Sequence, residues 1–290
     1  METSELQREV QGALGTTTLA PLAIGGQKQV YSAELEGVAV VVKVVLVPQD
    51  TTYAHEVLER AQREVELLST IESDYVVPVL SEAVEIGDRP EALCWVEEYL
   101  DGDDLRHLTT SFPWSENDTW HLIHDLAQGL AACHSLDVVH RDLSPGNVRR
   151  RSDGRFALLD PGLARHLTRT ALTGVFQPGT YGYMSPEHVP GGHPTPASDV
   201  FAVGVLAYQA LTGDVPVPFR GDAAAYYAQL HTGQSPPLIS AAPHLSTTIT
   251  SVVDRCLQRQ PARRYLDAHE LLADLPPLPS STDTGTGGAS

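Results

Sequence analysis

The sequence contains little cysteine. Its three cysteines, Cys94, Cys133 and Cys256, lie far apart, and an odd, scattered set fits neither a disulfide framework nor a Cys-x-x-Cys metal site. Unpaired thiols of this kind are usual in proteins of a reducing compartment. We therefore expect three reduced, mostly buried cysteines and a cytoplasmic location.

Long apolar runs are missing as well. The run at 38–47 is interrupted by Lys43, and the run at 200–211 is too short for the roughly 18 residues of a membrane span. The first residues, Met-Glu-Thr-Ser-Glu-Leu-Gln, lack the basic and apolar regions of a signal peptide. We expect a soluble protein with no membrane span.

The chain is also short of basic residues. Lysine and arginine number 19 against 37 aspartates and glutamates, so the formal net charge is −18. Nucleic acid is a disfavoured partner, because its phosphates require a basic surface. An acidic surface suits the attraction of basic peptides, or it serves solubility alone. Both interpretations of the charge stay open.

What the sequence does contain is a set of polar side chains suited to phosphoryl transfer. Asp142 and Asn147 stand five residues apart in the segment His-Arg-Asp-Leu-Ser-Pro-Gly-Asn-Val, which follows a helix-like run. Asp160 closes an apolar stretch and precedes Pro-Gly. A carboxylate that takes a hydroxyl proton and two oxygen ligands for Mg²⁺ are what phosphoryl transfer requires.

Strand signals dominate the first third of the chain. The β-branched run at 38–45 and the stretch at 92–100 predict strands, and the apolar spacing over 53–71 predicts a helix between them. Residues 101–104, Asp-Gly-Asp-Asp, are typical of a flexible connection.

Helical signals dominate the remainder. A capping box at Ser115 and Asp118 predicts the start of a helix that runs toward His134. Residues 198–212 form an apolar helical pattern, and helical patterns continue to residue 275. The chain therefore predicts two lobes with a cleft between them.

Two charges stand where the patterns require apolar residues. Lys43 interrupts its strand, and Glu64 lies on the apolar stripe of the helix at 53–71. An unpaired buried charge is costly, so we predict a Lys43–Glu64 ion pair that holds the lysine toward phosphate oxygens. The alternative is that Glu64 lies at the edge of the stripe and reaches water.

These motifs together resemble those of bacterial-type, eukaryotic-like serine/threonine protein kinases. The segment 140–148 resembles the catalytic loop H-R-D-x-x-x-x-N, and Asp-Pro-Gly at 160–162 resembles D-F-G. Gly-Thr-Tyr-Gly-Tyr-Met-Ser-Pro-Glu at 179–187 resembles the end of an activation segment. The resemblance covers about residues 14–275.

The resemblance implies an α+β, two-lobed fold, with an antiparallel sheet and one main helix in the N-lobe and a mostly helical C-lobe. The implied organisation is an N-terminal extension at 1–13, a kinase domain at 14–277 and a disordered tail at 278–290. Within the domain we expect the N-lobe at 14–98, the hinge at 98–102 and the C-lobe at 103–277.

The resemblance also implies a role for each matching residue. Asp142 is the implied catalytic base, and Thr180 contacts it. Lys43 is the implied ligand of the α- and β-phosphates, with Glu64 as its partner. The magnesium ligands implied are Asn147 and Asp160. The implied ATP-binding set is Ile24, Gly25, Gly26, Lys28, Val30, Lys43, Glu98, Leu100 and Asp104.

Further residues match the supporting parts of the family pattern. Glu187 is expected to pair with Arg264, and Asp199 is expected to brace the catalytic loop through its backbone. Arg141 is placed to bind a phosphate on the activation segment. The candidate phosphorylation sites there are Thr168, Thr170 and Thr173.

Several positions depart from the pattern. Ala23 and Lys28 stand where the phosphate loop has glycines, and Lys28 either offers a charge to phosphate or points into solvent. Ser144 stands where such kinases usually carry a lysine. Glu97 fills the normally apolar position behind the adenine, where a carboxylate must be paired, protonated or bent away.

Pro161 replaces the phenylalanine of D-F-G. Proline fixes its own φ, removes a backbone donor and pushes the preceding residue toward extended geometry. We expect Asp160 to keep its capacity to bind Mg²⁺ in a stiffer motif.

The resulting expectation is an ATP- and Mg²⁺-dependent serine/threonine protein kinase that acts on protein hydroxyls and phosphorylates its own activation segment. Its expected partner is a protein substrate with basic character. Two alternatives remain: a pseudokinase that binds nucleotide or partners, and a small-molecule phosphotransferase of the aminoglycoside-kinase type. The sequence indicates neither the physiological substrate nor an oligomeric state.

Overall fold

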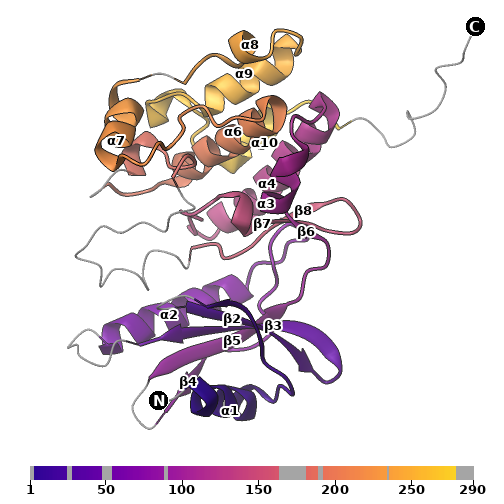
Figure 1. Cartoon of the computed structure of the whole chain (residues 1–290), viewed down its shortest axis with the longest axis vertical. Coiled ribbons are helices and arrows are strands. Elements are labelled where there is room, and N and C mark those ends of the chain that lie inside the picture. The colour runs from indigo at the N-terminus through magenta and orange to yellow at the C-terminus, as the bar shows by residue number, and fades with distance from the viewer. Residues whose placement is uncertain are drawn as a thin grey trace, which may run out of the picture.

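A computed structural model shows two lobes, a sheet-based N-lobe and a largely helical C-lobe (Figure 1). The residues that the structure describes are 3–24, 28–47, 54–87, 91–162, 181–188, 192–233 and 235–278. The predicted two-lobed α+β class is confirmed by this arrangement.

The N-lobe is built on one antiparallel sheet with strand order β1-β2-β3-β5-β4. The predicted strand at 38–45 is confirmed, as is most of the stretch at 92–100. The strands are β1 (Ala20–Ile24), β2 (Lys28–Leu35), β3 (Val38–Leu46), β4 (Val84–Ile86) and β5 (Ala92–Glu98).

Both faces of this sheet are covered by helices. On one face, α1 (Thr3–Leu14) contacts β4 and β5, and its Leu6 and Val10 belong to the same buried cluster as the β3 valines. On the other face, α2 (Ala54–Ser69) packs toward Trp95 of β5, on the side that faces the C-lobe (Figure 1). Double-sided burial explains the nearly continuous apolar run of β3. The helix predicted over 53–71 is thus confirmed, and α1 is a second N-lobe helix.

The C-lobe packs around the buried helix α6 (Pro196–Thr212), which contacts α4 (Glu116–His134) and α9 (Thr247–Cys256). The predicted N-terminal cap is present at the start of α4, where the Ser115 hydroxyl accepts from the Asp118 amide at 3.1 Å and donates to the Asp118 carboxylate at 2.7 Å. Shorter C-lobe helices are α3 (Leu105–Leu108), α7 (Ala223–Thr232), α8 (Leu238–Ala241) and α10 (Ala268–Asp274), with 3₁₀ turns η1 (Thr109–Ser111), η2 (Pro145–Asn147), η3 (Pro186–His188) and η4 (Pro261–Arg263).

A small second sheet lies where the lobes meet. It consists of β6 (Asp103–Asp104), β7 (Val148–Arg150) and β8 (Phe156–Leu158), in that order. Residues 75–80 connect it to the N-lobe. The Val77 amide donates to the Leu158 carbonyl at 2.9 Å, and the Glu98 amide donates to the Pro78 carbonyl at 3.0 Å. The sheet therefore places the polar residues after β8 directly below β3 and β5.

The three cysteines are free and buried, as expected. Burial raises the pKa of each thiol to about 12, so they are unreactive as thiolates. In the described part of the chain, no helix is both long and apolar enough to cross a membrane.

Candidate active site

The catalytic-loop segment is held from below by the first turn of α6. The buried Asp199 carboxylate accepts from the His140 amide at 2.7 Å and from the Arg141 amide at 2.9 Å, and it also contacts His134 Nε2 at 3.1 Å. Arg141 has a φ of 68°, a left-handed conformation that non-glycine residues rarely adopt. The contact expected for Asp199 is therefore present, and it stabilises an otherwise unfavourable backbone turn.

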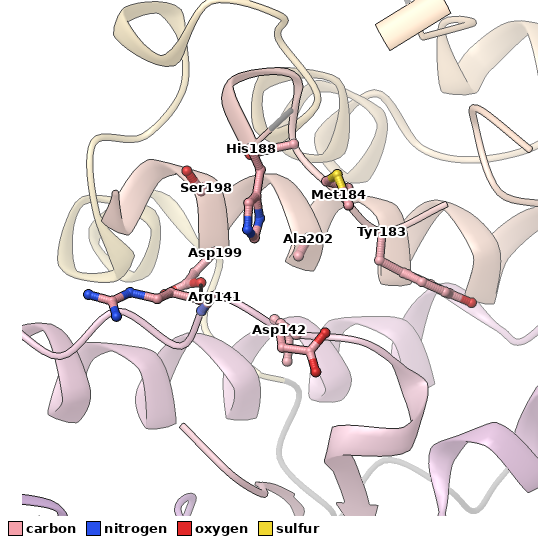
Figure 2. A pocket seen from close by; sticks show the side chains of 10 residues that line it. Arg141, Asp142, Tyr183, Met184, His188, Ser198, Asp199 and Ala202 are labelled. Atoms are coloured by element: carbon pink, nitrogen blue, oxygen red, sulfur yellow. Dashed lines mark hydrogen bonds between the residues drawn. The ribbon is translucent and has the colours of Figure 1, made fainter. Parts of the chain in front are cut away.

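Asp142 and Asn147 face each other across this loop. The Asn147 side-chain amide donates to the Asp142 carbonyl at 2.7 Å and to its carboxylate at 3.2 Å. Figure 2 shows Asp142 beside a small pocket, with Tyr183, Met184 and His188 on the opposite side. The loop thus presents the Asp142 carboxylate to this pocket.

Asp160 is joined to the same loop through the backbone. The Leu159 amide donates to the Asn147 carbonyl at 2.9 Å, and the Gly162 amide donates to the His140 carbonyl at 3.2 Å. The φ of Asp160 is 55°, so the prediction that Pro161 makes Asp160 extended is wrong. These bonds on either side of Asp160 hold the left-handed turn against the preference that proline imposes.

Both lysines of the 290-residue sequence, Lys28 and Lys43, contact Asp160. The Lys28 ammonium lies 2.6 Å from Asp160 Oδ1, and the Lys43 ammonium hydrogen-bonds to the same oxygen. Burial opposes ionisation of Asp160, but the two ammonium groups outweigh it and hold the pKa of Asp160 well below its ordinary value. Of the two interpretations of Lys28, the one in which it points into solvent is wrong in this structure.

The predicted Lys43–Glu64 ion pair is absent. Lys43 instead pairs with Glu97 and Asp160. In the β3–β5 register Lys43 faces Trp95, so Glu97, two residues further along β5, lies on the same face of the sheet. Its carboxylate is closer to the lysine than the helix residue is, and this is the physical reason for the correction.

Glu64 remains on the inner side of α2. Its Oε2 is buried and has no hydrogen-bond partner among the residues that the structure describes. Its Oε1 lies beside Gly162, since a Cβ built on that glycine would come within 2.7 Å of it. Burial raises the pKa of Glu64 to about 7, against the opposing charge of Arg141. The alternative in which Glu64 reaches water is not what the structure shows for that oxygen.

Of the three alternatives for the Glu97 carboxylate (paired, protonated or bent away), the structure shows the paired one. One carboxylate oxygen contacts Lys43, and the other accepts from the Trp95 indole at 2.8 Å. The Glu97 side chain is 3% exposed. Motif matching missed this residue as a site member. The signal that could have found it was a carboxylate in an apolar strand, two residues from the cross-strand neighbour of Lys43.

The expected nucleotide residues that the structure describes lie on β1 and β2, at the end of β5 and just before α3. Val30 of β2 faces Lys43 in the strand register, and Ile24 on β1 is exposed. Glu98 ends β5, and Asp104 caps α3 by accepting from the Arg106 amide at 2.7 Å. Leu100 is buried beneath them. Gly25 and Gly26 lie outside the described residues.

The expected Glu187–Arg264 pair is present in the C-lobe. The guanidinium donates twice to the carboxylate, at 2.7 and 2.8 Å, and also to three backbone carbonyls. Arg264 is 2% exposed and lies over the Phe201 ring. Burial favours the neutral acid, but Arg264 prevails and lowers the pKa of Glu187. Thr168, Thr170, Thr173 and Thr180 lie outside the described residues.

Comparison with known proteins gives one family match. Residues 17–274 match the model described as "Protein kinase domain". A serine/threonine-protein kinase, pkn2 of Myxococcus xanthus, is 35% identical over 263 residues, which cover 87% of this chain and 31% of that protein. PknL of Mycobacterium tuberculosis is 33% identical, with 88% of this chain and 63% of that protein covered. PrkC of Bacillus subtilis is 26% identical, with 87% and 38% covered. The chain thus spans less than two thirds of the length of each of these relatives.

Proposed function

Because this chain belongs to the protein kinase domain family, we propose that it is a serine/threonine protein kinase that transfers the γ-phosphate of Mg-ATP to protein hydroxyls. One observation carries the proposal: Asn147 donates directly to Asp142, and backbone bonds from Leu159 and Gly162 to the same loop join Asp160, with its two lysine partners, to this pair. The names of the similar bacterial proteins support the choice of serine and threonine as acceptors.

The residues fit a divalent metal. Asp160 is held ionised, and Asn147 uses its amide nitrogen toward Asp142, which leaves its side-chain oxygen as a ligand. Carboxylate and amide oxygens are the ligands that Mg²⁺ prefers. When bound to these two residues, the ion supplies positive charge to the phosphate oxygens.

The remaining roles fall to side chains of this chain. Asp142 orients the acceptor hydroxyl and takes its proton. Lys43 binds the α- and β-phosphates, and Lys28 supplies the second cation that Ser144 does not provide. Backbone groups from Glu98 to Leu100 hold the adenine, and Asp104 binds the ribose or a basic substrate side chain. The net charge of −18 supports a basic protein substrate.

The proposal includes regulation and location. The activation segment is phosphorylated by the enzyme itself at Thr168, Thr170 or Thr173, and Arg141 binds that phosphate. Three free, buried cysteines support a cytoplasmic location.

The test is incubation of the full chain with γ-labelled Mg-ATP and a basic protein. We expect label on serine and threonine, and a loss of about 10²- to 10⁴-fold in kcat for Asp142→Asn, because that range is typical for a general base. Asp214→Asn, at an exposed site, serves as the matched control. Nucleotide binding without transfer would instead identify a pseudokinase, in which Lys28 and Lys43 remain paired with Asp160. Transfer to small alcohols alone would identify a small-molecule phosphotransferase.

A further inference from the structure

The pair formed by Lys43 and Glu97 lies within one sheet. The register of β3 and β5 runs without interruption from Val40 opposite Glu98 to Leu46 opposite Ala92. Both partners of the pair stand on the inner face of these two strands. Their separation is therefore fixed by the strand ladder and does not depend on the position of any helix.

The environment of Glu97 commits both of its oxygens. Oε2 contacts the Lys43 ammonium, and Oε1 accepts from the Trp95 indole at 2.8 Å. Trp95 is itself fully buried, so the indole holds the carboxylate in one orientation. A carboxylate fixed in this way is a built partner for a buried cation.

Glu64, by contrast, is not in contact with Lys43. It belongs to α2, and its Oε2 is buried without a hydrogen-bond partner among the described residues. The residue that the motif pattern assigns to the lysine is thus turned toward Gly162.

We propose that Glu97, not Glu64, is the positioning residue that holds Lys43 for the phosphates of the nucleotide. This inference rests on the proposed function, because it assigns a task to Lys43 in that reaction. Its physical reason is the second role proposed for Asp160. Asp160 is also a proposed metal ligand, so Glu97 is the contact that would keep the Lys43 side chain, 4% exposed in this structure, in place while its ammonium binds the phosphates.

The experiment compares isosteric changes at the two carboxylates, Glu97→Gln and Glu64→Gln, in the full chain. Calorimetric titration with Mg-AMP-PNP, a non-hydrolysable ATP analogue, measures nucleotide affinity. We expect Glu97→Gln to weaken binding about tenfold, in line with the loss of a charged hydrogen bond, and Glu64→Gln to have a smaller effect. The exposed Glu34→Gln is the control that leaves affinity unchanged.

A double-mutant cycle tests whether Glu97 affects nucleotide affinity through Lys43 or only through the stability of the fold. In a Lys43→Met background, Glu97→Gln should cause no further loss of affinity. An equal loss with and without Lys43 would overturn the proposal. If Glu97→Gln folds poorly, Trp95→Phe removes the indole donor together with part of a buried ring. It should lower affinity by a few fold, and the same cycle with Lys43→Met separates the loss that acts through Lys43 from the loss of packing.

The lysine content allows a direct readout. With Lys28→Arg, Lys43 is the single lysine of the chain, and ¹⁵N-lysine labelling gives one side-chain ammonium signal to follow. We expect Glu97→Gln to move that signal with and without Mg-AMP-PNP, and Glu64→Gln to leave it in place. A signal that follows Glu64 in the nucleotide complex would overturn the proposal. Neither readout requires phosphate transfer, so an inactive chain would refute the proposed kinase activity and leave the Glu97 assignment to be judged separately.

Discussion

Two charge networks support the candidate site, one in each lobe, and they follow the family pattern to different degrees. In the C-lobe, Asp199 and the Glu187–Arg264 pair make the contacts that their motifs predict. In the N-lobe, Lys43 has exchanged the expected partner Glu64 for Glu97. The C-lobe contacts involve backbone groups of fixed position. The contacts of Lys43 join side chains alone, and its partner within the sheet is the carboxylate that the β3–β5 register places on the same face.

Removal of Arg264 should have the largest effect on stability. Arg264→Met leaves Glu187 without its bidentate partner and frees three backbone carbonyls of theirs. Breaking a buried ion pair on one side typically costs about 3–5 kcal/mol, and we expect a loss of that order in the free energy of urea unfolding. Arg263→Met, at the exposed neighbouring position, is the control. A loss below about 1 kcal/mol would mean that the C-lobe network is no firmer than a surface pair.

Glu64→Gln should remove a pH dependence of stability. The pKa of Glu64 in the folded chain is about 7, above its ordinary value of 4.5. The unfolded chain therefore loses this proton first, and ionisation destabilises the fold as pH rises through that interval. At about 1.4 kcal/mol per pKa unit, the loss is on the order of 3 kcal/mol and is fully present above the folded pKa.

Urea unfolding between pH 5 and pH 8 measures this difference. The wild type should lose more stability than Glu64→Gln as pH rises, with Glu66→Gln on the exposed side of α2 as the control. If the free energy of unfolding depends on pH in the same way for the wild type and for Glu64→Gln, then Glu64 has a partner in solution. The N-lobe and C-lobe networks would then differ less than this structure indicates.

Lys28→Met should have the smallest effect on stability and should mainly lower the affinity for Mg-ATP. Its side chain is 30% exposed, so the loss of its contact with Asp160 should change the free energy of unfolding by no more than about 1 kcal/mol. Affinity for Mg-ATP should fall by up to about tenfold, because one phosphate-facing cation is lost. Lys28→Arg keeps the charge and should retain most of the affinity. Unchanged affinity in Lys28→Met would remove Lys28 from the proposed site.

Much of this structure can be predicted from local sequence. The helix α2, the strand β3 and the cap at Ser115 each depend on residues within one turn or one strand, and all three were predicted. The motif spacing also predicted that Asp199 meets the loop and that Glu187 meets Arg264.

The features that were missed depend on long-range geometry. The partner of Lys43 depends on the register of β3 against β5, which a single sequence does not specify. The left-handed φ of Asp160 depends on bonds from its neighbours to His140 and Asn147, and these outweigh the local preference of Pro161. Helix α1 has few apolar residues, and only the sheet face that it covers explains the burial of Leu6 and Val10.

The segment at 75–80 acts as a spacer of fixed length between the two carboxylates that share Lys43. Its Tyr75 carbonyl and Val77 amide are bonded to Leu158, two residues before Asp160, while its Pro78 carbonyl is bonded to Glu98, next to Glu97. Any rotation of the lobes that separates Glu97 from Asp160 must break this connection. Opening of the proposed nucleotide site should therefore pivot about residues 75–80 and widen near β1 and β2, while Lys43 stays close to Glu97 and Asp160.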